Sequence, residues 1–480
     1  MNNELEEIGE VSVPENTGAQ EKEIEKKKKN SKYEIDMTTG SIGRKMLKFA
    51  IPLILSGMLQ VLFNTADTIV VGRWAGDASL AAVGASGALF FLFTNLLIGT
   101  ATGINVTVAR DYGTGKIKPL QDSIHTSMAL AIVGGFLIGI AGFFAARPIL
   151  IIMDTPGEIL DLATLYLRIV FAGMPVSAVY NFGSAILRAK GDTRRPLYYL
   201  SIAGVLNICL NLFFVIVLHM AVEGVALATV ISQILSMVLT LRCLTHEEPK
   251  FRLVIKHIRF NKTKVKQILS VGIPAGLQSC MFSFSNLFIQ SAINSFGPIV
   301  MAGSAAASSL ENFTYIGINS FTQAATSFTS QNIGAGKISR IKNISQKANI
   351  LAILVGLIMG FATCFAGNFL VGIYTTNPES IAQGVYRLWF VCGMYFVYAP
   401  MDVITGVLRG MGSSTSTTII SLLGICVLRI IFFTTLFALP VFHTLFWVYA
   451  TWPISWVVTG IAQFVLYKIR FRQLQGNVKV

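Results

Sequence analysis

Long apolar runs, separated by short polar segments, dominate the pattern of hydrophobic and polar positions along the chain. About twelve of these runs reach the roughly 20 mainly apolar residues that a helix needs to cross the hydrocarbon core of a bilayer. They lie near 47–71, 80–107, 122–146, 159–187, 196–218, 222–241, 267–295, 298–329, 343–373, 384–408, 416–438 and 444–467. Each run is continuously apolar and does not alternate at every second residue, which favours helices over a transmembrane β-barrel. The pattern therefore predicts an all-α polytopic membrane protein.

The composition supports this prediction and excludes an ordinary soluble enzyme. Of the 480 residues, 53% are hydrophobic and only 13% are charged, whereas roughly a quarter of the residues in a soluble domain are charged. A soluble protein needs polar residues to cover its surface, so lipid must surround most of this chain. The six cysteines include no CxxC pair, so neither a disulfide framework nor a zinc site is indicated.

The placement of the 38 Lys and Arg residues predicts the topology. A net charge of +14 is compatible with a nucleic-acid partner, but in membrane proteins basic residues collect in the cytoplasmic loops. With the spans above, 33 of the 38 lie on one side and only Arg73 and Arg147 lie on the other, while Arg168, Arg387 and Arg429 fall inside spans. We therefore expect an even number of spans, both termini in the cytoplasm, a multi-pass location in the plasma (inner) membrane, and no nucleic-acid partner.

An internal repeat divides the chain into two halves. Three short motifs recur at spacings of 222, 221 and 221 residues, namely 47–52 at 269–274, 113–116 at 334–337, and 187–191 at 408–412. Two six-helix repeats with the same orientation follow, an arrangement typical of transporters whose halves rock around a central site. The predicted parts are a disordered cytoplasmic tail (1–44), an N-lobe (45–243), a cytoplasmic linker (244–266), a C-lobe (267–470) and a second cytoplasmic tail (471–480).

No motif for cofactor or nucleotide chemistry is present in the sequence. The Gly-x-Gly-Lys segments at 113–116 and 334–337 lack the spacing of a phosphate loop, and Ile follows each Lys. We interpret both segments as helix ends. The five histidines do not cluster and no H-E-x-x-H occurs, so we expect a transporter without a cofactor and not an enzyme.

Three acidic residues, Asp67, Glu311 and Asp402, fall well inside predicted spans. An ionised carboxylate near the bilayer centre costs about 3 kcal/mol even on a mild scale, so such residues are candidates for function. None of the three has an acidic counterpart at the repeat spacing, which places them in the asymmetric part of the molecule. Structural alternatives remain open: Asp67 near the outer end of a tilted span, Glu311 in a pair with an Arg, and Asp402 as a cap near Arg409.

Asp67 is the centre of a predicted cation site. Asn207 and Asn211 lie one helical turn apart on one face of the fifth span, and Thr229 lies in the sixth. Carbonyl and hydroxyl oxygens with one carboxylate suit Na⁺, whereas a desolvated carboxylate suits H⁺. The alternative is that these polar side chains only join neighbouring helices.

The eighth span carries an unusual load of polar residues for a membrane helix. They are Ser304, Ser308, Ser309, Glu311, Asn312, Thr314, Asn319, Ser320, Thr322 and Gln323. A helix surrounded by lipid could not bury so many polar groups, so we expect this span to line a water-filled cavity.

Several segments resemble the multidrug and toxic compound extrusion (MATE) family. They are Asn64-Thr65-Ala66-Asp67-Thr68, Gln331–Lys337 and Gly406–Gly412, and the resemblance extends over about 45–470. It implies a V-shaped antiporter of twelve helices that exports organic, often cationic, compounds in exchange for inward Na⁺ or H⁺.

Within that family the sequence is most similar to the DinF-like branch. This resemblance matches Asp67, Asn207 and Thr229 to a cation site in the N-lobe, while the branch has a second acid where this chain has Asn211. The NorM-like branch has a Glu in its seventh span at the position of Phe282 here, so that site is not carried over.

Glu311 and Asp402 are then the candidates for C-lobe function. We also expect Asn64 and Arg429 to face the substrate cavity, with Arg429 as a counterion. The predicted protein is a monomeric secondary active exporter whose partners are small organic compounds, a monovalent cation (Na⁺ or H⁺) and the bilayer. The alternative is a flippase of related fold for lipid-linked oligosaccharides, which would need a strongly basic cavity for pyrophosphate.

Overall fold

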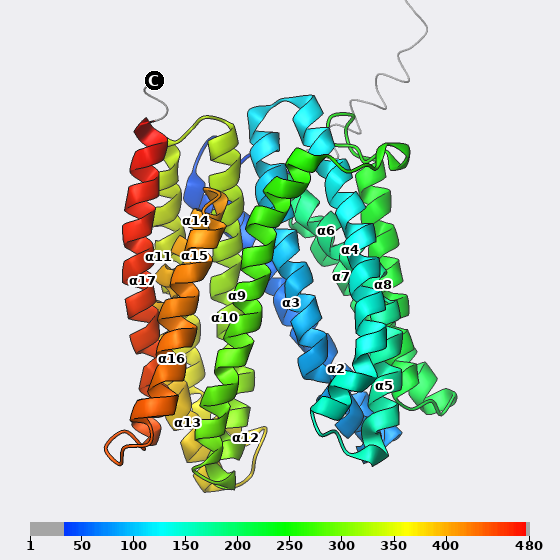
Figure 1. Ribbon diagram of the computed structural model, residues 1–480, viewed down its shortest axis with the longest axis vertical. Helices are drawn as coiled ribbons and strands as arrows, with labels where there is room; N and C mark the ends of the chain where they lie inside the picture. The colour runs from blue at the N-terminus through cyan, green and yellow to red at the C-terminus, as the bar shows by residue number, and fades with distance from the viewer. Residues whose placement is uncertain (1–32, 477–480) are drawn as a thin grey trace, which may run out of the picture.

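The structure, a computed structural model, describes residues 33–476, and its regular elements there are helices. The first half contains α2 (Ile42–Val70) with the π-helical turn Val71–Ala75, α3 (Asp77–Thr114), α4 (Ile117–Ile152), α5 (Gly157–Ala172), α6 (Met174–Lys190), α7 (Arg194–Leu212) with the π-helical turn Phe213–Val217, and α8 (Val222–Thr245). After the short 3₁₀ turn Ile255–His257, the second half contains α9 (Lys262–Asn294), α10 (Pro298–Gly334), α11 (Ser339–Phe365), α12 (Gly367–Gly372), α13 (Pro378–Val391), α14 (Tyr395–Gly410), α15 (Ser414–Ser421), α16 (Leu428–Ile431) and α17 (Leu445–Gly476). The π-helical turns Leu422–Val427 and Phe432–Leu436 flank α16. Figure 1 shows two helical bundles side by side.

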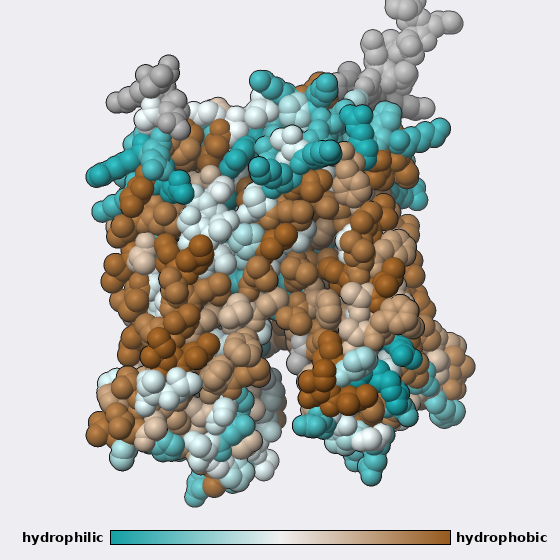
Figure 2. All heavy atoms as spheres, in the orientation of Figure 1, coloured by the Kyte–Doolittle hydropathy of each residue, from teal (hydrophilic) through white to brown (hydrophobic). Residues whose placement is uncertain are grey.

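The helices confirm the predicted membrane fold. Among residues 33–476, nine helical segments are long and apolar enough to cross a bilayer, and two bent pairs, α5–α6 and α13–α14, raise the number to as many as eleven. Each pair bends by 47°. The 37-residue helix α10 completes the twelve segments of the predicted pattern but is not apolar enough to count, because its buried face is rich in Ser and Thr. Figure 2 shows a broad hydrophobic band between two more hydrophilic ends.

The first helix of each repeat crosses from one bundle to the other. Met46 and Phe49, near the start of α2, belong to a buried cluster formed mostly by helices of the second half, and the Phe49 ring packs edge-on against Phe328 at 5.9 Å. In the mirror arrangement, Ile268 of α9 belongs to the cluster of the first half. Figure 1 shows α9 descending from one bundle into the other. We call α3–α8 the N-lobe and α10–α17 the C-lobe, with α2 and α9 joining them.

The segment before α2 differs from the prediction of a disordered tail over 1–44. Residues 1–32 lie outside the described residues, but the part that we call the strap, residues 34–41, packs against both lobes. Glu34 contacts Lys190 at 3.3 Å, while the carbonyl oxygen of Met37 accepts a hydrogen bond from Asn332 at 3.0 Å. The strap sits in place because its own backbone carbonyls and Glu34 supply partners to polar groups at the helix ends.

Two glycines bring the lobes into backbone contact on the side that carries the chain ends. A Cβ atom on Gly334 of α10 would lie 1.9 Å from the carbonyl oxygen of Arg110, and one on Gly113 of α3 would lie 2.1 Å from that of Gln331. Any larger residue would force α3 and α10 apart. The sequence interpretation of these positions as simple helix ends missed this role.

The hydrogen bonds across the same contact are formed by residues at equivalent positions of the two repeats. The Nη2 atom of Arg110 donates to the carbonyl oxygen of Gly410 at 3.1 Å, and Gln331, the counterpart of Arg110, donates to that of Ala189 at 2.7 Å. Ala189 is in turn the counterpart of Gly410 at the spacing of 221 residues. The two lobes are therefore closed against each other on the chain-end side, while Figure 2 shows a notch between them on the opposite side.

A buried ionic cluster secures the N-lobe at the chain-end side. The Nζ atom of Lys190, whose side chain is fully buried, lies 3.0 Å from Glu247, and Arg195 contacts both Glu247, at 2.5 Å, and Asp192. Burial of Glu247 opposes its ionisation, but the charges of Lys190 and Arg195 outweigh burial and hold its pKa below the usual value.

Replacing the contact glycine should open the closed side. In a variant lacking the six native cysteines and carrying Ser327→Cys, whose side chain is 1% exposed in this interface, Gly334→Val should make the new thiol reactive toward a water-soluble maleimide. Gly43→Val is the matched control, because nothing lies within 4 Å of a Cβ atom there. Equal labelling of both variants would contradict the contact role of Gly334.

Removing the Glu247 charge should destabilise the protein by about 3 kcal/mol, because the buried side chain of Lys190 loses one of its carboxylate partners. Thermal unfolding of Glu247→Gln in detergent measures this loss, with Glu248→Gln, whose side chain is 20% exposed and 3.5 Å from Lys250, as control. Because the folded-state pKa of Glu247 is lowered, its contribution is present above the ordinary value of about 4.5 and is lost as the pH falls through the lower folded-state pKa. The difference between wild type and variant should therefore shrink in acid.

Candidate functional site

The structure brings three of the four residues predicted for the cation site together. Asp67 lies on α2, and Asn207 and Asn211 lie on the facing side of α7. The Nδ2 atom of Asn211 donates a hydrogen bond to Oδ1 of Asp67 and a longer one, at 3.3 Å, to Oδ1 of Asn207. Both asparagines are buried, and Asp67 is half-buried. The spacing of the two asparagines on one helical face produces this cluster, as the sequence predicted.

The cluster contains an oxygen without a partner. Oδ1 of Asn211 is buried and accepts no hydrogen bond from the described part of the chain. Buried carbonyl oxygens in proteins nearly always have a partner, so an orphan beside a carboxylate calls for a donor or a cation. Carboxylate and amide oxygens are the ligands that hard cations prefer. The arrangement is suited to holding a small cation or a proton.

Thr229 does not join this cluster by a hydrogen bond. Its hydroxyl group donates to the carbonyl oxygen of Val225, one turn earlier on α8, at 2.9 Å. This intrahelical bond is the usual solution for a threonine within a membrane helix. Its predicted role as a cation ligand stays a prediction.

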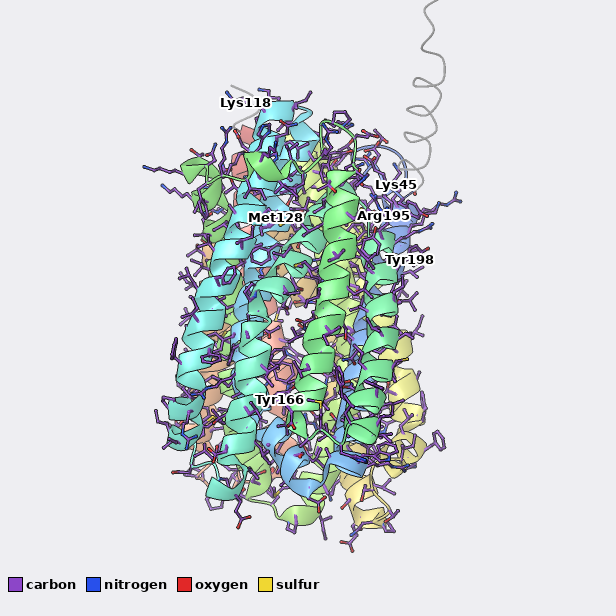
Figure 3. All side chains as sticks on the ribbon, turned by 90° about the vertical axis from the view of Figure 1, so that its right-hand side faces the viewer. Lys45, Lys118, Met128, Tyr166, Arg195 and Tyr198 are labelled. Carbon is purple, nitrogen blue, oxygen red and sulfur yellow. The ribbon has the colours of Figure 1, made fainter. Side chains whose placement is uncertain are left out.

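Tyr166 of α5 is a neighbour of Asp67 that the sequence interpretation missed. Its hydroxyl group lies within electrostatic range of the Asp67 carboxylate, and Figure 3 shows it in the half of the molecule away from Lys45 and Lys118. A tyrosine in an apolar span is too common to attract attention. Its repeat counterpart at 221 residues is Arg387, so a comparison of polar span residues between the halves could have found it.

A central cavity of about 400 Å³ lies between the lobes. Its charged lining residues are Arg188, Asp402 and Arg409. The carboxylate of Asp402 accepts a hydrogen bond from the Thr322 hydroxyl group at 2.6 Å, while Arg409 donates to Gln278 at 2.9 Å. Asp402 therefore faces a cavity and is held by α10, and no ion pair joins it to Arg409 within residues 33–476.

A second cavity, which we call the C-lobe cavity, has a volume of about 540 Å³. Its charged lining residues are Glu311, Arg387 and Arg429. Arg387 donates two hydrogen bonds to Glu311, at 2.7 and 2.9 Å, and a third to the Ser304 hydroxyl group at 2.5 Å. The alternative in which Glu311 pairs with an arginine is the one that the structure shows.

Two further predictions concern the lining of the cavities. Several polar residues of α10 line them, among them Ser308, Glu311, Asn312, Asn319 and Thr322, so the prediction that this helix faces a cavity is confirmed.

Asn64, which we also expected to face the substrate cavity, does not line either cavity. Its side chain is exposed, because α2 turns this position away from both cavities.

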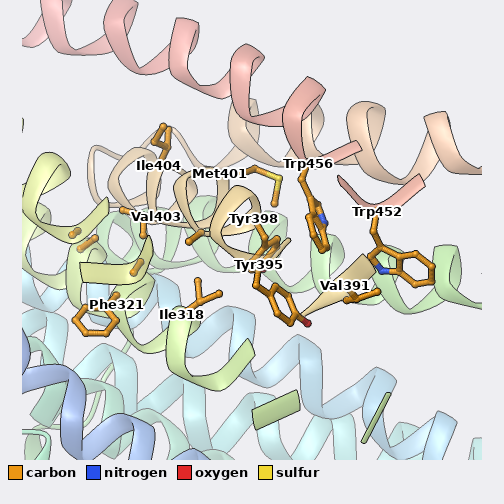
Figure 4. Packing of buried hydrophobic residues seen from close by; sticks show 14 of the residues in the cluster. Ile318, Phe321, Val391, Tyr395, Tyr398, Met401, Val403, Ile404, Trp452 and Trp456 are labelled. Carbon is orange, nitrogen blue, oxygen red and sulfur yellow. The ribbon is translucent and has the colours of Figure 1, made fainter. Parts of the chain in front are cut away.

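Arg429 lies in the C-lobe cavity with 4% of its surface exposed. It does not form an ion pair with an acid among the described residues, so its expected role as a counterion stays a prediction. Its guanidinium group lies over the ring of Trp452, 5.5 Å from the ring centre. Figure 4 shows the neighbouring aromatic group, in which Tyr395 and Tyr398 of α14 face Trp456 of α17.

Comparison with known proteins gives a family match in both halves. The family model described as MatE matches residues 52–213 and 274–435, and the second match begins 222 residues after the first. The chain is 28% identical over 402 residues to the probable multidrug resistance protein YpnP of Bacillus subtilis, which covers 82% of this chain and 88% of that protein. It is 26% identical over 394 residues to the probable multidrug resistance protein NorM of Thermotoga maritima, covering 81% and 84%.

A solved structure has the same fold. It is described as the outward-facing conformation of a multidrug resistance MATE family transporter of the MOP superfamily, and it superposes with a TM-score of 0.84 at 22% identity. The superposition covers 92% of this chain and 98% of that one. The predicted two-repeat architecture is therefore confirmed.

The pair in the C-lobe cavity gives a test of buried charge. Glu311→Gln leaves Arg387, which is 5% exposed, without its carboxylate, and should lower the free energy of unfolding by about 3–5 kcal/mol. The double variant Glu311→Gln/Arg387→Gln should recover most of this loss in thermal unfolding, because no unpaired charge remains. A double variant as unstable as the single one would assign the loss to packing.

Proposed function

The chain belongs to the MatE family of multidrug efflux transporters, and from this premise we propose that it is a secondary active exporter that moves small organic compounds out of the cell in exchange for inward Na⁺ or H⁺. Both relatives described above are named as multidrug resistance proteins, which supports small organic substrates. Assignment to the DinF-like branch stays a prediction, as does a monomeric state.

The observation that carries the proposal is the cluster of Asp67 with Asn207 and Asn211. A lone carboxylate within the membrane is costly unless a cation or a proton neutralises it. No basic side chain forms an ion pair with Asp67 in the described chain, and the Asn211 oxygen beside it has no donor. The site is therefore poised for a small positive ion and supports coupling at this point.

The orientation of the molecule follows from its charges. Figure 3 shows Lys45, Lys118 and Arg195 at one end, and the positive-inside rule assigns that end to the cytoplasm of the cell, with both termini there. The closed glycine contact then faces the cytoplasm and the notch faces outward. The described conformation is the one in which an exporter releases its substrate and accepts the cation at Asp67 from outside.

Coupling requires that the two ligands prefer opposite conformations. A ligand with equal affinity for both states moves no equilibrium, however tightly it binds. In the proposed cycle, cation binding at Asp67 favours the outward-open state, and substrate entering from the cytoplasm favours the inward-open one. The electrochemical gradient of the cation then drives export.

The flippase alternative has less support. Pyrophosphate needs several free guanidinium groups in one place, and the four arginines of the two cavities are divided between them, with Arg387 already bound to Glu311. Transport of a fluorescent lipid-linked sugar pyrophosphate by reconstituted protein, independent of any cation gradient, would favour the flippase.

Loss of the Asp67 charge should uncouple export from the cation. In proteoliposomes with an imposed Na⁺ or pH gradient, Asp67→Asn should reduce gradient-driven efflux by about tenfold or more, a typical coupling effect, with little change in thermal unfolding. Running each gradient alone identifies the ion. Asp77→Asn, which removes an exposed carboxylate at the start of α3, is the matched control, and full gradient-driven efflux by Asp67→Asn would remove the site assignment.

A further inference from the structure

We infer that the C-lobe cavity binds an organic anion with an aromatic ring, and that Arg429 pairs with the acidic group of this compound. The inference rests on the proposed exporter function and names the chemical class of the compound that enters this cavity. It differs from the expectation of cationic substrates, and it follows from the charges, hydrogen bonds and aromatic side chains around Arg429.

The charge of the cavity is the first reason. Glu311 and Arg387 neutralise each other through two hydrogen bonds, which leaves Arg429 as the uncompensated charge among the lining residues. An arginine that is 4% exposed and lacks a carboxylate is costly in a low-dielectric environment. A negatively charged compound would remove this cost when it binds.

The hydrogen bonds of Arg429 hold the guanidinium group without neutralising it. Its Nε and Nη2 atoms donate to the Ser455 hydroxyl oxygen at 3.1 and 2.9 Å, and that hydroxyl group donates onward to the carbonyl oxygen of Trp452 at 2.9 Å. The Nη1 atom has no hydrogen-bond partner in the described chain. The planar guanidinium group is therefore fixed in place, with donors left for a carboxylate or sulfonate.

The aromatic walls indicate the rest of the compound. Trp452 lies close to two guanidinium groups, those of Arg387 at 5.3 Å and Arg429 at 5.5 Å. Tyr395 and Trp456 stack with a ring separation of 5.7 Å and an interplanar angle of 15°. Flat aromatic faces favour a planar ring, and a cavity of about 540 Å³ lies within the usual range for small organic ligands.

An organic cation fits the same cavity poorly. Its positive charge would lie near Arg429, while the carboxylate of Glu311 is already engaged by Arg387. The two span acids without an ion-pair partner lie elsewhere: Asp67 is on the N-lobe side, and Asp402 is in the central cavity, where it accepts a hydrogen bond from Thr322. Like charges in a low-dielectric cavity repel strongly, so the cavity should select against cations.

The C-lobe cavity adjoins the central cavity. Five residues line both the central cavity and the C-lobe cavity: Asn95, Ser279, Phe282, Tyr315 and Tyr398. The central cavity carries Arg188 and Arg409 against the single acid Asp402. An anion in the central cavity would therefore meet a net positive charge next to the C-lobe cavity.

Two probes of the same shape and opposite charge test the proposal directly. Equilibrium dialysis of purified full-length protein in lipid nanodiscs, checked by tryptophan fluorescence, measures binding of naphthalene-2-sulfonate and of trimethyl(2-naphthyl)ammonium. Empty nanodiscs correct for partition into lipid. We expect the sulfonate to bind about tenfold or more tightly than the ammonium compound, as a desolvated charge-assisted pair requires.

The variants assign this preference to Arg429. Arg429→Gln should weaken sulfonate binding by about tenfold or more and leave the ammonium compound bound as well or better. Arg168→Gln is the matched control, since Arg168 is another arginine within a span but lines neither cavity. If Arg429→Gln does not fold, Arg429→Lys, which keeps the charge, and Ser455→Ala, which frees the guanidinium group, should each weaken sulfonate binding about threefold or more.

The results separate this inference from the exporter proposal. Equal or tighter binding of the ammonium compound by the wild type, or unchanged sulfonate binding in the Arg429 variants, overturns the inferred substrate class. In that case cation-driven efflux that depends on Asp67 would leave the exporter function standing. Conversely, Arg429-dependent binding without any transport would support the anion site and contradict the exporter proposal.

Discussion

A charge inside the bilayer must be neutralised, and this constraint governs the arrangement of the polar interior of this protein. The ionisable side chains inside the described chain meet this constraint in three ways. Glu311 and Arg387 neutralise each other as an ion pair, Asp402 accepts a hydrogen bond at a cavity wall, and Asp67 and Arg429 have no ion-pair partner. The third arrangement leaves places for ligands of opposite charge.

The repeat explains why the contact between the lobes is symmetric although their interiors differ. The hydrogen bonds and glycine contacts on the chain-end side recur at the repeat spacing, so both lobes meet through equivalent surfaces. Asp67 and Arg429, the residues proposed to contact ligands, have no charged counterparts at this spacing. The contact between the lobes is therefore symmetric, whereas the residues proposed to bind ligands are not.

Much of the fold could be predicted from the sequence because it depends on local composition. The apolar runs, the basic loops and the repeated motifs are each visible within short stretches, and the asparagines of the cation cluster share one helical face. The pairing of Glu311 with Arg387 could only be left open, because 76 residues separate the two partners. The crossing of α2 and α9 between lobes, the strap, and the nearness of Tyr166 to Asp67 likewise depend on long-range packing that periodicity does not encode.

The position of the strap gives helix α2 a mechanical role. The strap is bound to both lobes at the chain-end side, and α2 begins directly after it at Ile42 and continues unbroken past Asp67 to Val70. A helix of 29 residues spans about 40 Å at 1.5 Å per residue. One helix therefore joins the place where the lobes are fastened to the place where an ion would sit, and Pro52, which lacks a backbone N–H, is a weak point between the two ends. A bend of α2 at Pro52 would change the position of Asp67 relative to the strap.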